Sequence, residues 1–368
     1  MSYAHPVRCL HPSPRCALTL ALALALGAAC GRSHDLGVQS STSSSSGAGS
    51  ASSSAGSGGA GGASPTSVAS SGTGTGGIGG VDAGPPGPTE LTVVNGVNDY
   101  PAVRFCFLPG DAPWPAETAG LPFAGSRVAA PVSGPIPAGA DVTPWVIAGD
   151  LTTTTGKTCT EILALASGAA PPIVAQPLAV IPKGVFDSHK SLLLVADGCL
   201  GGPGHDDPSA VTACGAGYTS QTPTAGVVLV SMSRVKDTGH VSLQVVSAST
   251  ALAKSDVSIM PNLMGAMAKV VAPALSQGAI GPTPPFAAYT ATELGPLDGL
   301  KIETFLPGTA YMQSAITLDK VLAGSSLGAA AFVNGASLVL VAVGSDPGLP
   351  VGGFWHAFTY ALVKAEPG

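Results

Sequence analysis

Short apolar runs separated by turn-forming residues limit what this chain can fold into. Most of the runs beyond residue 88 are bounded by Gly, Pro, Asn or Asp, as β-strands typically are. They cover 91–96, 102–108, 191–198, 225–235, 241–249, 256–260, 299–308 and 336–344. With 50 Gly and 33 Pro in 368 residues, long helices are disfavoured. One helix is expected over 261–275, where Pro273 limits its length. The folded part is therefore predicted to be mostly β, two-layered, with long loops.

The folded part also contains an internal repeat. The pattern LTVVNGVNDYPAVRFCF near Leu91 returns as LQVVSASTALAKSDVSIM near Leu243, and SHKSLLLVADGCLGGP near Ser188 returns as NGASLVLVAVGSDPGLP near Asn334. Each half then closes on a further strand, AGVVLVSMSRV or WHAFTYALVKA. We predict an all-β fold of two tandem β-sandwich domains, 90–235 and 236–368, each of ordinary domain size. Coincidental similarity in a Val-, Leu- and Ala-rich composition is the alternative.

These repeated segments resemble a family of bacterial extracytoplasmic domains of unknown function. Its members are immunoglobulin-like β-sandwiches common in lipoproteins of myxobacteria and their relatives, and they open with a strand, a small polar turn and an alternating strand. The segment near Leu91 is the better match and the segment near Leu243 the second. The resemblance implies a periplasmic or surface module, and it brings no catalytic residue.

The N-terminus has the parts of a secretory signal peptide, predicted over 1–29. Arg8 and Arg15 supply positive charge, an apolar run follows over 17–29, and Gly27, Ala28 and Ala29 are small. The run is too short to cross a bilayer, which needs roughly 20 apolar residues. Cleavage is therefore favoured over a retained membrane anchor.

The segment LGAAC, which ends at Cys30, resembles the lipobox of bacterial lipoproteins. The resemblance implies that Cys30 is acylated on its thiol and amine, and Gly31, where a retention signal would place Asp, points to the outer membrane or cell surface. Gly27 departs from the family, which prefers Leu there. An ordinary cut after Ala29, giving a periplasmic or secreted protein, is the alternative.

A Ser/Gly/Ala-rich linker follows over 30–89. From about residue 40 to 88 it has almost no large apolar side chain, so it is expected to be disordered. A coil of about 50 residues reaches roughly 40 Å. We interpret the linker as a spacer between a membrane and the folded part.

Four cysteines lie in the folded part: Cys106, Cys159, Cys199 and Cys214. An even number in an exported chain suggests two disulfides. Of three possible pairings, Cys199 with Cys214 and Cys106 with Cys159 is favoured. A four-cysteine zinc site is the weaker alternative, because no C-x₂-C pair is present.

One motif has the pattern of a serine hydrolase. Gly324 to Gly328 matches G-x-S-x-G around Ser326, and Asp346 and His356 follow in hydrolase order. In a chain this rich in Gly, about one such match is expected by chance, and no strand-to-helix pattern surrounds it. Thr155 to Thr158 evokes a phosphate loop but has Leu151 where that motif requires Gly.

Two further groups could bind a ligand. His205, Asp206 and Asp207 form a weak candidate for a cation site, with a solvated turn as the favoured interpretation because the alternating spacing of a calcium loop is absent. Trp114, Trp145 and Trp355 would form a carbohydrate platform only if two of them met on one face.

The charge excludes one class of partner. The formal net charge is −6, charged residues make up 10%, and there is no basic run, so nucleic acid is not expected to bind. We expect a non-catalytic structural, adhesive or binding role without a cofactor, with the membrane and an envelope protein or polysaccharide as partners. A glycan or small-ligand binder is the first alternative, and a hydrolase using Ser326 is the second.

Overall fold

A computed structural model describes residues 89–129, 135–137, 139–168, 170–186, 190–250, 252–284, 286, 289–349 and 354–365. The predicted signal peptide, Cys30 and the linker up to residue 88 lie outside the described residues. The described chain is mostly β, as predicted, and its strands form four four-stranded sheets.

The first half of the folded part contributes two sheets. Its inner sheet has the order β4-β1-β7-β8 and its outer sheet the order β3-β2-β5-β6. The strands are β1 (Glu90–Asn95), β2 (Ala102–Leu108), β3 (Leu121–Pro122), β4 (Ser126–Ala129), β5 (Thr143–Gly149), β6 (Ile173–Pro177), β7 (Ser191–Asp197) and β8 (Gly226–Met232). All pairs are antiparallel except the parallel pair β1 and β7.

The second half repeats this topology strand for strand. Its inner sheet, β12-β9-β15-β16, and its outer sheet, β11-β10-β13-β14, reproduce both orders once eight is added to each strand number. The strands are β9 (Ser242–Ser247), β10 (Lys254–Met260), β11 (Lys269–Ser276), β12 (Ile280–Gly281), β13 (Lys301–Phe305), β14 (Met312–Thr317), β15 (Ser337–Val343) and β16 (Thr359–Lys364). Here the parallel pair is β9 and β15. The repeated sequence patterns therefore correspond to equivalent strands.

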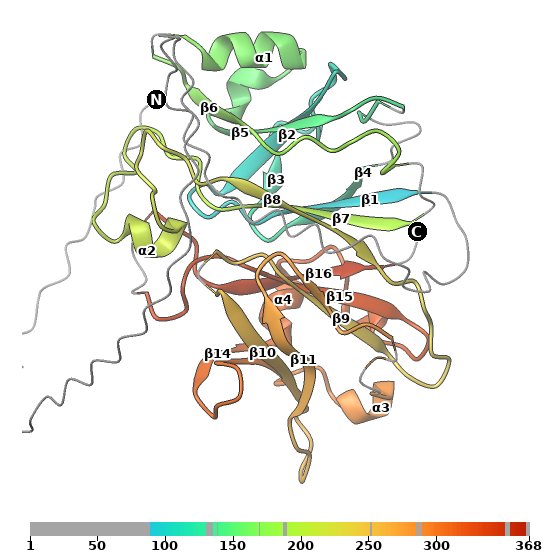
Figure 1. Ribbon diagram of the computed structural model, residues 1–368. Coiled ribbons are helices and arrows are strands. Elements are labelled where there is room, and N and C mark those ends of the chain that lie inside the picture. The colour runs from blue at the N-terminus through green and yellow to red at the C-terminus, as the bar shows by residue number, and fades with distance from the viewer. Residues whose placement is uncertain are drawn as a thin grey trace, which may run out of the picture. The chain divides into compact units, whose positions relative to one another are not determined.

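The sheets stack in the order outer, inner, inner, outer (Figure 1). One apolar cluster fills the space between the two sheets of each half, and a third lies between the two inner sheets. Along β15, Leu338 and Leu340 enter the core of the second half, whereas Val339 and Val341 enter the cluster between the inner sheets. Both faces of β7 and β15 are thus buried, which is why SLLLVAD and SLVLVAV are almost continuously apolar.

The two halves contact each other reciprocally. β4 lies against β16, and the equivalent β12 lies against β8. This is the pattern of an isologous interface, in which two equivalent surfaces pair with each other. The halves share one of the chain's apolar cores, so the central strands of both inner sheets, β1, β7, β9 and β15, are almost fully buried.

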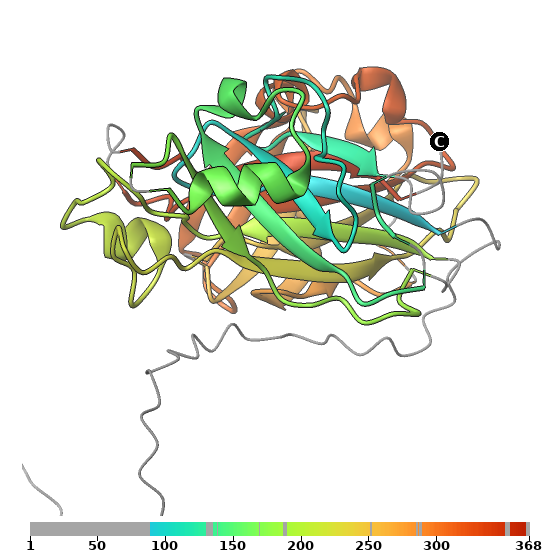
Figure 2. The same ribbon diagram turned by 90° about the horizontal axis from the view of Figure 1, so that it is seen from above.

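Short helices occupy the connections. They are α1 (Cys159–Ala166), α2 (Ala210–Cys214), α3 (Ala291–Leu294) and α4 (Leu318–Ala323), with 3₁₀ turns at Leu151–Thr154 and Ala329–Ala331. Helix α1 covers the outer sheet of the first half (Figure 2). It begins with a capping box, in which Thr158 and Glu161 each accept a hydrogen bond from the other's backbone N–H.

The helix predicted over 261–275 is wrong. These residues form the turn between β10 and β11 and most of β11 itself. Their Leu, Met and Ala residues favour a helix locally, but antiparallel pairing with β10 prevails. Pro273 is tolerated because β11 is an edge strand, where a residue without an N–H need not break a hydrogen bond between strands.

Candidate functional site: a loop cluster where the parallel strands end

The connections that follow β1, β7 and β15 meet at one end of the inner sheets. Because β1 and β7 are parallel, as are β9 and β15, their carboxyl ends lie side by side. We call the described residues of 96–100, 198–225 and 344–358 the loop cluster. It lies at the left of Figure 1, where α2 and the red connection before β16 come together. The site is therefore built by both halves of the chain.

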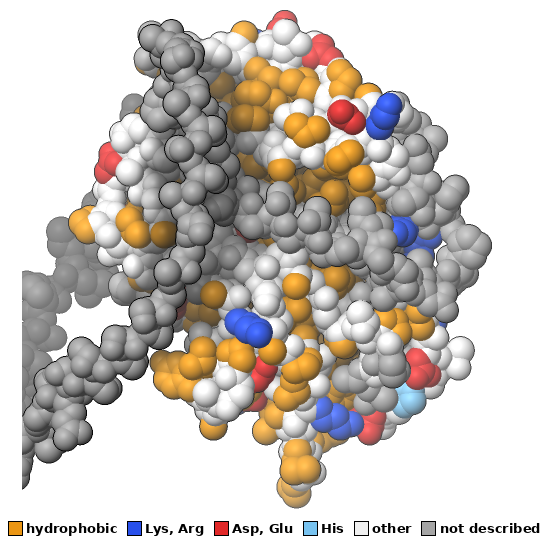
Figure 3. Space-filling view, viewed as in Figure 1, with side chains coloured by type: hydrophobic (Ala, Val, Ile, Leu, Met, Phe, Trp, Pro, Cys, Tyr) orange, Lys and Arg blue, Asp and Glu red, His pale blue; other side chains and the backbone are white. Residues whose placement is uncertain are grey.

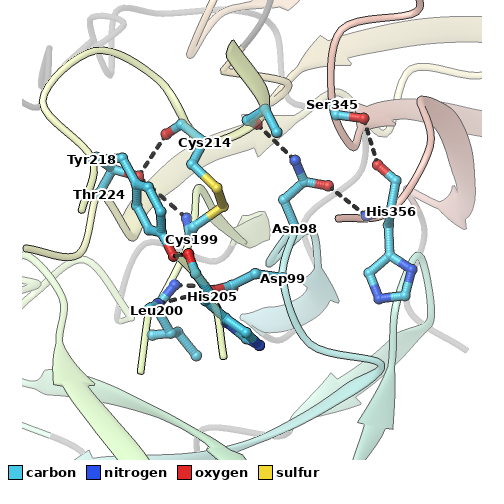
Figure 4. Close-up of a disulfide and its surroundings, with 12 residues drawn as sticks. Asn98, Asp99, Cys199, Leu200, His205, Cys214, Tyr218, Thr224, Ser345 and His356 are labelled. Atoms are coloured by element: carbon cyan, nitrogen blue, oxygen red, sulfur yellow. Dashed lines mark hydrogen bonds and ion pairs between the residues drawn. A yellow bond between two sulfur atoms is a disulfide. The ribbon is translucent and has the colours of Figure 1, made fainter. Parts of the chain in front are cut away.

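A buried carboxylate forms the centre of the cluster. The Asp99 side chain is fully buried and accepts hydrogen bonds from the backbone N–H groups of Leu200 (2.9 Å) and Gly201 (2.7 Å). The same carboxylate lies 3.1 Å from Nδ1 of His205 (Figure 4). When Nδ1 carries the proton toward Asp99, Nε2 is left as an acceptor on the other edge of the ring. Asp99 thus fixes both the loop and the orientation of His205.

Asn98 attaches the second half to this centre. Its side-chain amide donates to the carbonyl of Ala213 (2.7 Å), while its Oδ1 and its backbone carbonyl both accept from the N–H of His356. Ser345 Oγ in turn donates to the carbonyl of His356 (2.7 Å). Figure 4 shows Asn98 bonded to His356, and His356 bonded to Ser345. One asparagine therefore joins the connections that follow β7 and β15.

Four rings pack in sequence across the cluster. His205 stacks on Phe354 with centroids 4.5 Å apart and planes 5° apart, and its ring centroid is 4.6 Å from that of Tyr100. Phe354 contacts Trp355 edge to face at 5.2 Å. All four side chains belong to partly exposed residues. We call Tyr100, His205, Phe354 and Trp355 the ring row.

The surroundings keep nearby titratable groups neutral. Burial, followed by the charge of Asp99, raises the pKa of Tyr100, and the same two causes raise the pKa of Tyr218. Burial lowers the pKa of His356, although a hydrogen bond with the Tyr100 backbone and the charge of Asp99 oppose it. The two tyrosines are hydroxyl donors at neutral pH: Tyr100 to the carbonyl of Gly201 (2.7 Å) and Tyr218 to that of His205 (3.3 Å).

Both expected disulfides are present. Cys199–Cys214 links the end of β7 to α2, and both cysteines are fully buried. Thr224 braces it by donating to the carbonyl of Cys214 (2.6 Å). Cys106–Cys159 joins β2 to α1 on the far side of the outer sheet. The first disulfide therefore holds the loop cluster, whereas the second holds the helix over the outer sheet.

The structure separates the three residues of the predicted cation site. His205 faces Asp99, Asp206 is exposed, and Asp207 accepts from the N–H of Ser209 (2.7 Å) just before α2. Within the described ranges, no group of three His, Cys, Asp or Glu side chains is placed to hold a metal ion.

The residues of the hydrolase motif are not joined to one another. Ser326 is exposed after α4, Asp346 accepts from the N–H of Gly348 (2.7 Å), and the ring of His356 stacks on Phe123 at 4.1 Å. No hydrogen bond among the described residues links the three side chains. His356 instead belongs to the loop cluster through its backbone.

The three tryptophans lie in different environments. Trp114 packs on Phe105 and Phe107, on the inner side of the outer sheet. Trp145 lies on the opposite side of that sheet, beside the Cys106–Cys159 disulfide. Trp355 alone joins the loop cluster. A platform of two tryptophans is therefore not seen among the described residues, and His205, Phe354 and Tyr100 accompany Trp355 instead.

The chain has no match among known protein-family models, nor among curated proteins. No helix within the described ranges combines the length and apolar character needed to span a bilayer. The disulfides indicate a location outside the cytoplasm.

Proposed function

We propose that this protein is an exported, membrane-tethered binding module that recognises an envelope polysaccharide through its loop cluster. The observation that carries this proposal is the ring row, with the edge of His205 fixed by Asp99. Sugar rings present C–H faces that pack on aromatic side chains and hydroxyls that pair with fixed acceptors and donors. The ring row combines both kinds of group.

The construction of the cluster suits binding more than catalysis. Asp99 already has three hydrogen-bond partners, two backbone N–H groups and His205, and Asn98 is bonded on both sides of its amide. Such bonds hold the rings in place before a ligand arrives, which reduces the entropy lost on binding. The low content of charged residues also fits a neutral polymer better than an ionic substrate.

Tethering is the second part of the proposal. The signal-like segment over 17–29, Cys30 and the Ser/Gly/Ala-rich linker suit a lipoprotein of the outer membrane or cell surface. The immunoglobulin-like family relationship suggested by the segments near Leu91 and Leu243 belongs to this proposal too. Each half pairs two sheets around a core, which is the sandwich arrangement such a relationship requires.

The binding claim is tested by cosedimentation of the full chain with insoluble envelope polysaccharide from the producing cell. We expect Trp355→Ala and His205→Ala each to weaken binding at least tenfold, about 1.4 kcal/mol. His240→Ala is the matched control, because His240 also bonds an aspartate, Asp237, but lies in the exposed connection before β9. Equal affinity of all variants, with unchanged thermal unfolding, would refute the proposed site.

A further inference from the structure

The connection between β10 and β11 ends in an exposed apolar tip, which we define as residues 263–267. Met264 has 106% and Met267 80% of its reference surface exposed, and Leu263 has 40%. Figure 3 shows hydrophobic side chains at the projecting end of this hairpin. The two methionine side chains are therefore almost wholly outside the packing of the described chain.

Contacts with the segment 295–298 fix the base of this hairpin, and the tip projects from that base. The Asn262 amide donates to the carbonyl of Asp298 (2.9 Å), and Leu263 lies against Gly295, where an added Cβ would come within 2.8 Å of the leucine. Gly265 turns the chain with φ of 79°, and a Cβ there would meet nothing within 4 Å. The methionines therefore extend into open space.

We propose that this tip inserts into the lipid surface to which the chain is tethered. The step rests on the membrane tether of the proposed function. The tip, LMGAM, contains no charged side chain, so its entry into an apolar medium buries no side-chain charge. Methionine is unbranched and flexible, so it adapts to irregular apolar surroundings such as the boundary between headgroups and acyl chains.

The charges near the base specify how the tip would bind. Lys269 and Lys301 are exposed there, but Glu293 and Asp298 are exposed nearby and Glu293 pairs with Lys269 at 3.7 Å. These two positive and two negative groups give no basic collar, so insertion does not require anionic lipid. A tether of about 60 residues supplies an effective concentration high enough for a weak apolar contact to form.

The test places a fluorophore on the tip of a protein that is attached to lipid vesicles by its N-terminus. Residues 31–368 carry an N-terminal histidine tag, which binds them to phosphatidylcholine vesicles that contain a nickel-chelating lipid. The fluorophore NBD is attached to the cysteine of Met264→Cys. The control carries it on the cysteine of Tyr311→Cys. The four remaining cysteines are in disulfides, so the new thiol is the only free one. Tyr311 is 68% exposed in the β13–β14 turn, at the opposite end of the same sheet.

We expect doxyl-labelled lipid to quench NBD at residue 264 at least twice as strongly as at residue 311. This ratio should be the same when a quarter of the lipid is anionic phosphatidylglycerol. Equal quenching at both sites would overturn the proposal. A blue shift that grows with protein concentration without vesicles would also overturn it, since it would assign the tip to a second copy. Because the tag replaces the lipid, neither result depends on acylation of Cys30, which fractionation of the full chain tests separately.

Discussion

Gly198 and Gly344 directly follow the equivalent strands β7 and β15, and both have a left-handed backbone. Their φ angles are 75° and 96°, and an added Cβ would lie 2.4 Å from the carbonyl oxygen of Thr224 or 2.5 Å from that of Ala357. Each contact is made just before the next strand of its half begins. The repeat therefore extends to backbone conformation and to the close approach of the following segment.

Replacing either glycine by alanine is expected to destabilise the fold strongly. A Cβ at either position meets both backbone strain and a carbonyl oxygen, so Gly198→Ala and Gly344→Ala should each lower the free energy of unfolding by more than about 2 kcal/mol. Gly156→Ala, with φ of 71° and open space around it, is the control and should lose only about 1 kcal/mol. Urea unfolding measures all three. A loss at Gly198 but not at Gly344 would argue against equivalence.

The predictability of the fold depended on how each strand is buried. Strands buried on both faces, such as β7 and β15, are continuous apolar runs and were predicted nearly to the residue. Strands β4, SRVA, and β14, MQSAIT, are partly exposed and contain no such run, so the sequence pattern does not mark them. Helix α1 was missed too, although Thr158 and Glu161 carry the capping-box spacing that could have revealed it.

Asp197 makes stability depend on pH. It is buried at the end of β7, and burial raises its pKa from 3.8 to about 7 despite hydrogen bonds that include one from Gln277 of the second half. The folded state thus holds a proton that the unfolded state releases above about pH 4. This contribution is fully present below pH 4 and is lost as pH rises to about 7, on the order of 4 kcal/mol.

Asp197→Asn should remove this loss. We expect the variant to be more stable than the parent at pH 8, by a few kcal/mol, and the difference to shrink as pH falls toward 4. Denaturant midpoints at pH 4.5, 6 and 8 measure it. A pH-independent difference between the two chains would show that Asp197 does not titrate in this range.

The two disulfides should differ in what their loss affects. Their cysteines are 15 and 53 residues apart, so the chain-entropy model gives about 3 kcal/mol for Cys199–Cys214 and about 4 kcal/mol for Cys106–Cys159. Replacing Cys199 and Cys214 by alanine should also speed proteolysis within 199–225, because that disulfide holds the loop cluster. Replacing the other pair should leave that cleavage rate unchanged under native conditions.

Replacing Asp99 should destabilise the protein more than replacing an exposed acid of the loop cluster. Asp99→Ala leaves the N–H groups of Leu200 and Gly201 without their acceptor, which is expected to cost about 3 kcal/mol or more. Asp206→Ala, at an exposed neighbouring position, is the control and should change stability by less than about 0.5 kcal/mol. Thermal unfolding at pH 7 compares the two; similar losses would contradict the central role of Asp99.

The site itself was only partly predictable. His205 was recognised as a candidate, but the acid that faces it is Asp99, 106 residues earlier, and not the adjacent Asp206 or Asp207. That pairing depends on the parallel arrangement of β1 and β7, which no local pattern encodes. Phe354 enters the site from the other half of the chain, so only the complete topology brings the ring row together.

Hydrogen–deuterium exchange with and without envelope polysaccharide would locate the polysaccharide-binding surface without any substitution. We expect slower exchange within 198–225 and 344–358 when the polysaccharide is present, with no change in the turn between β10 and β11. Protection confined to the outer sheets, or none at saturating polysaccharide, would contradict it.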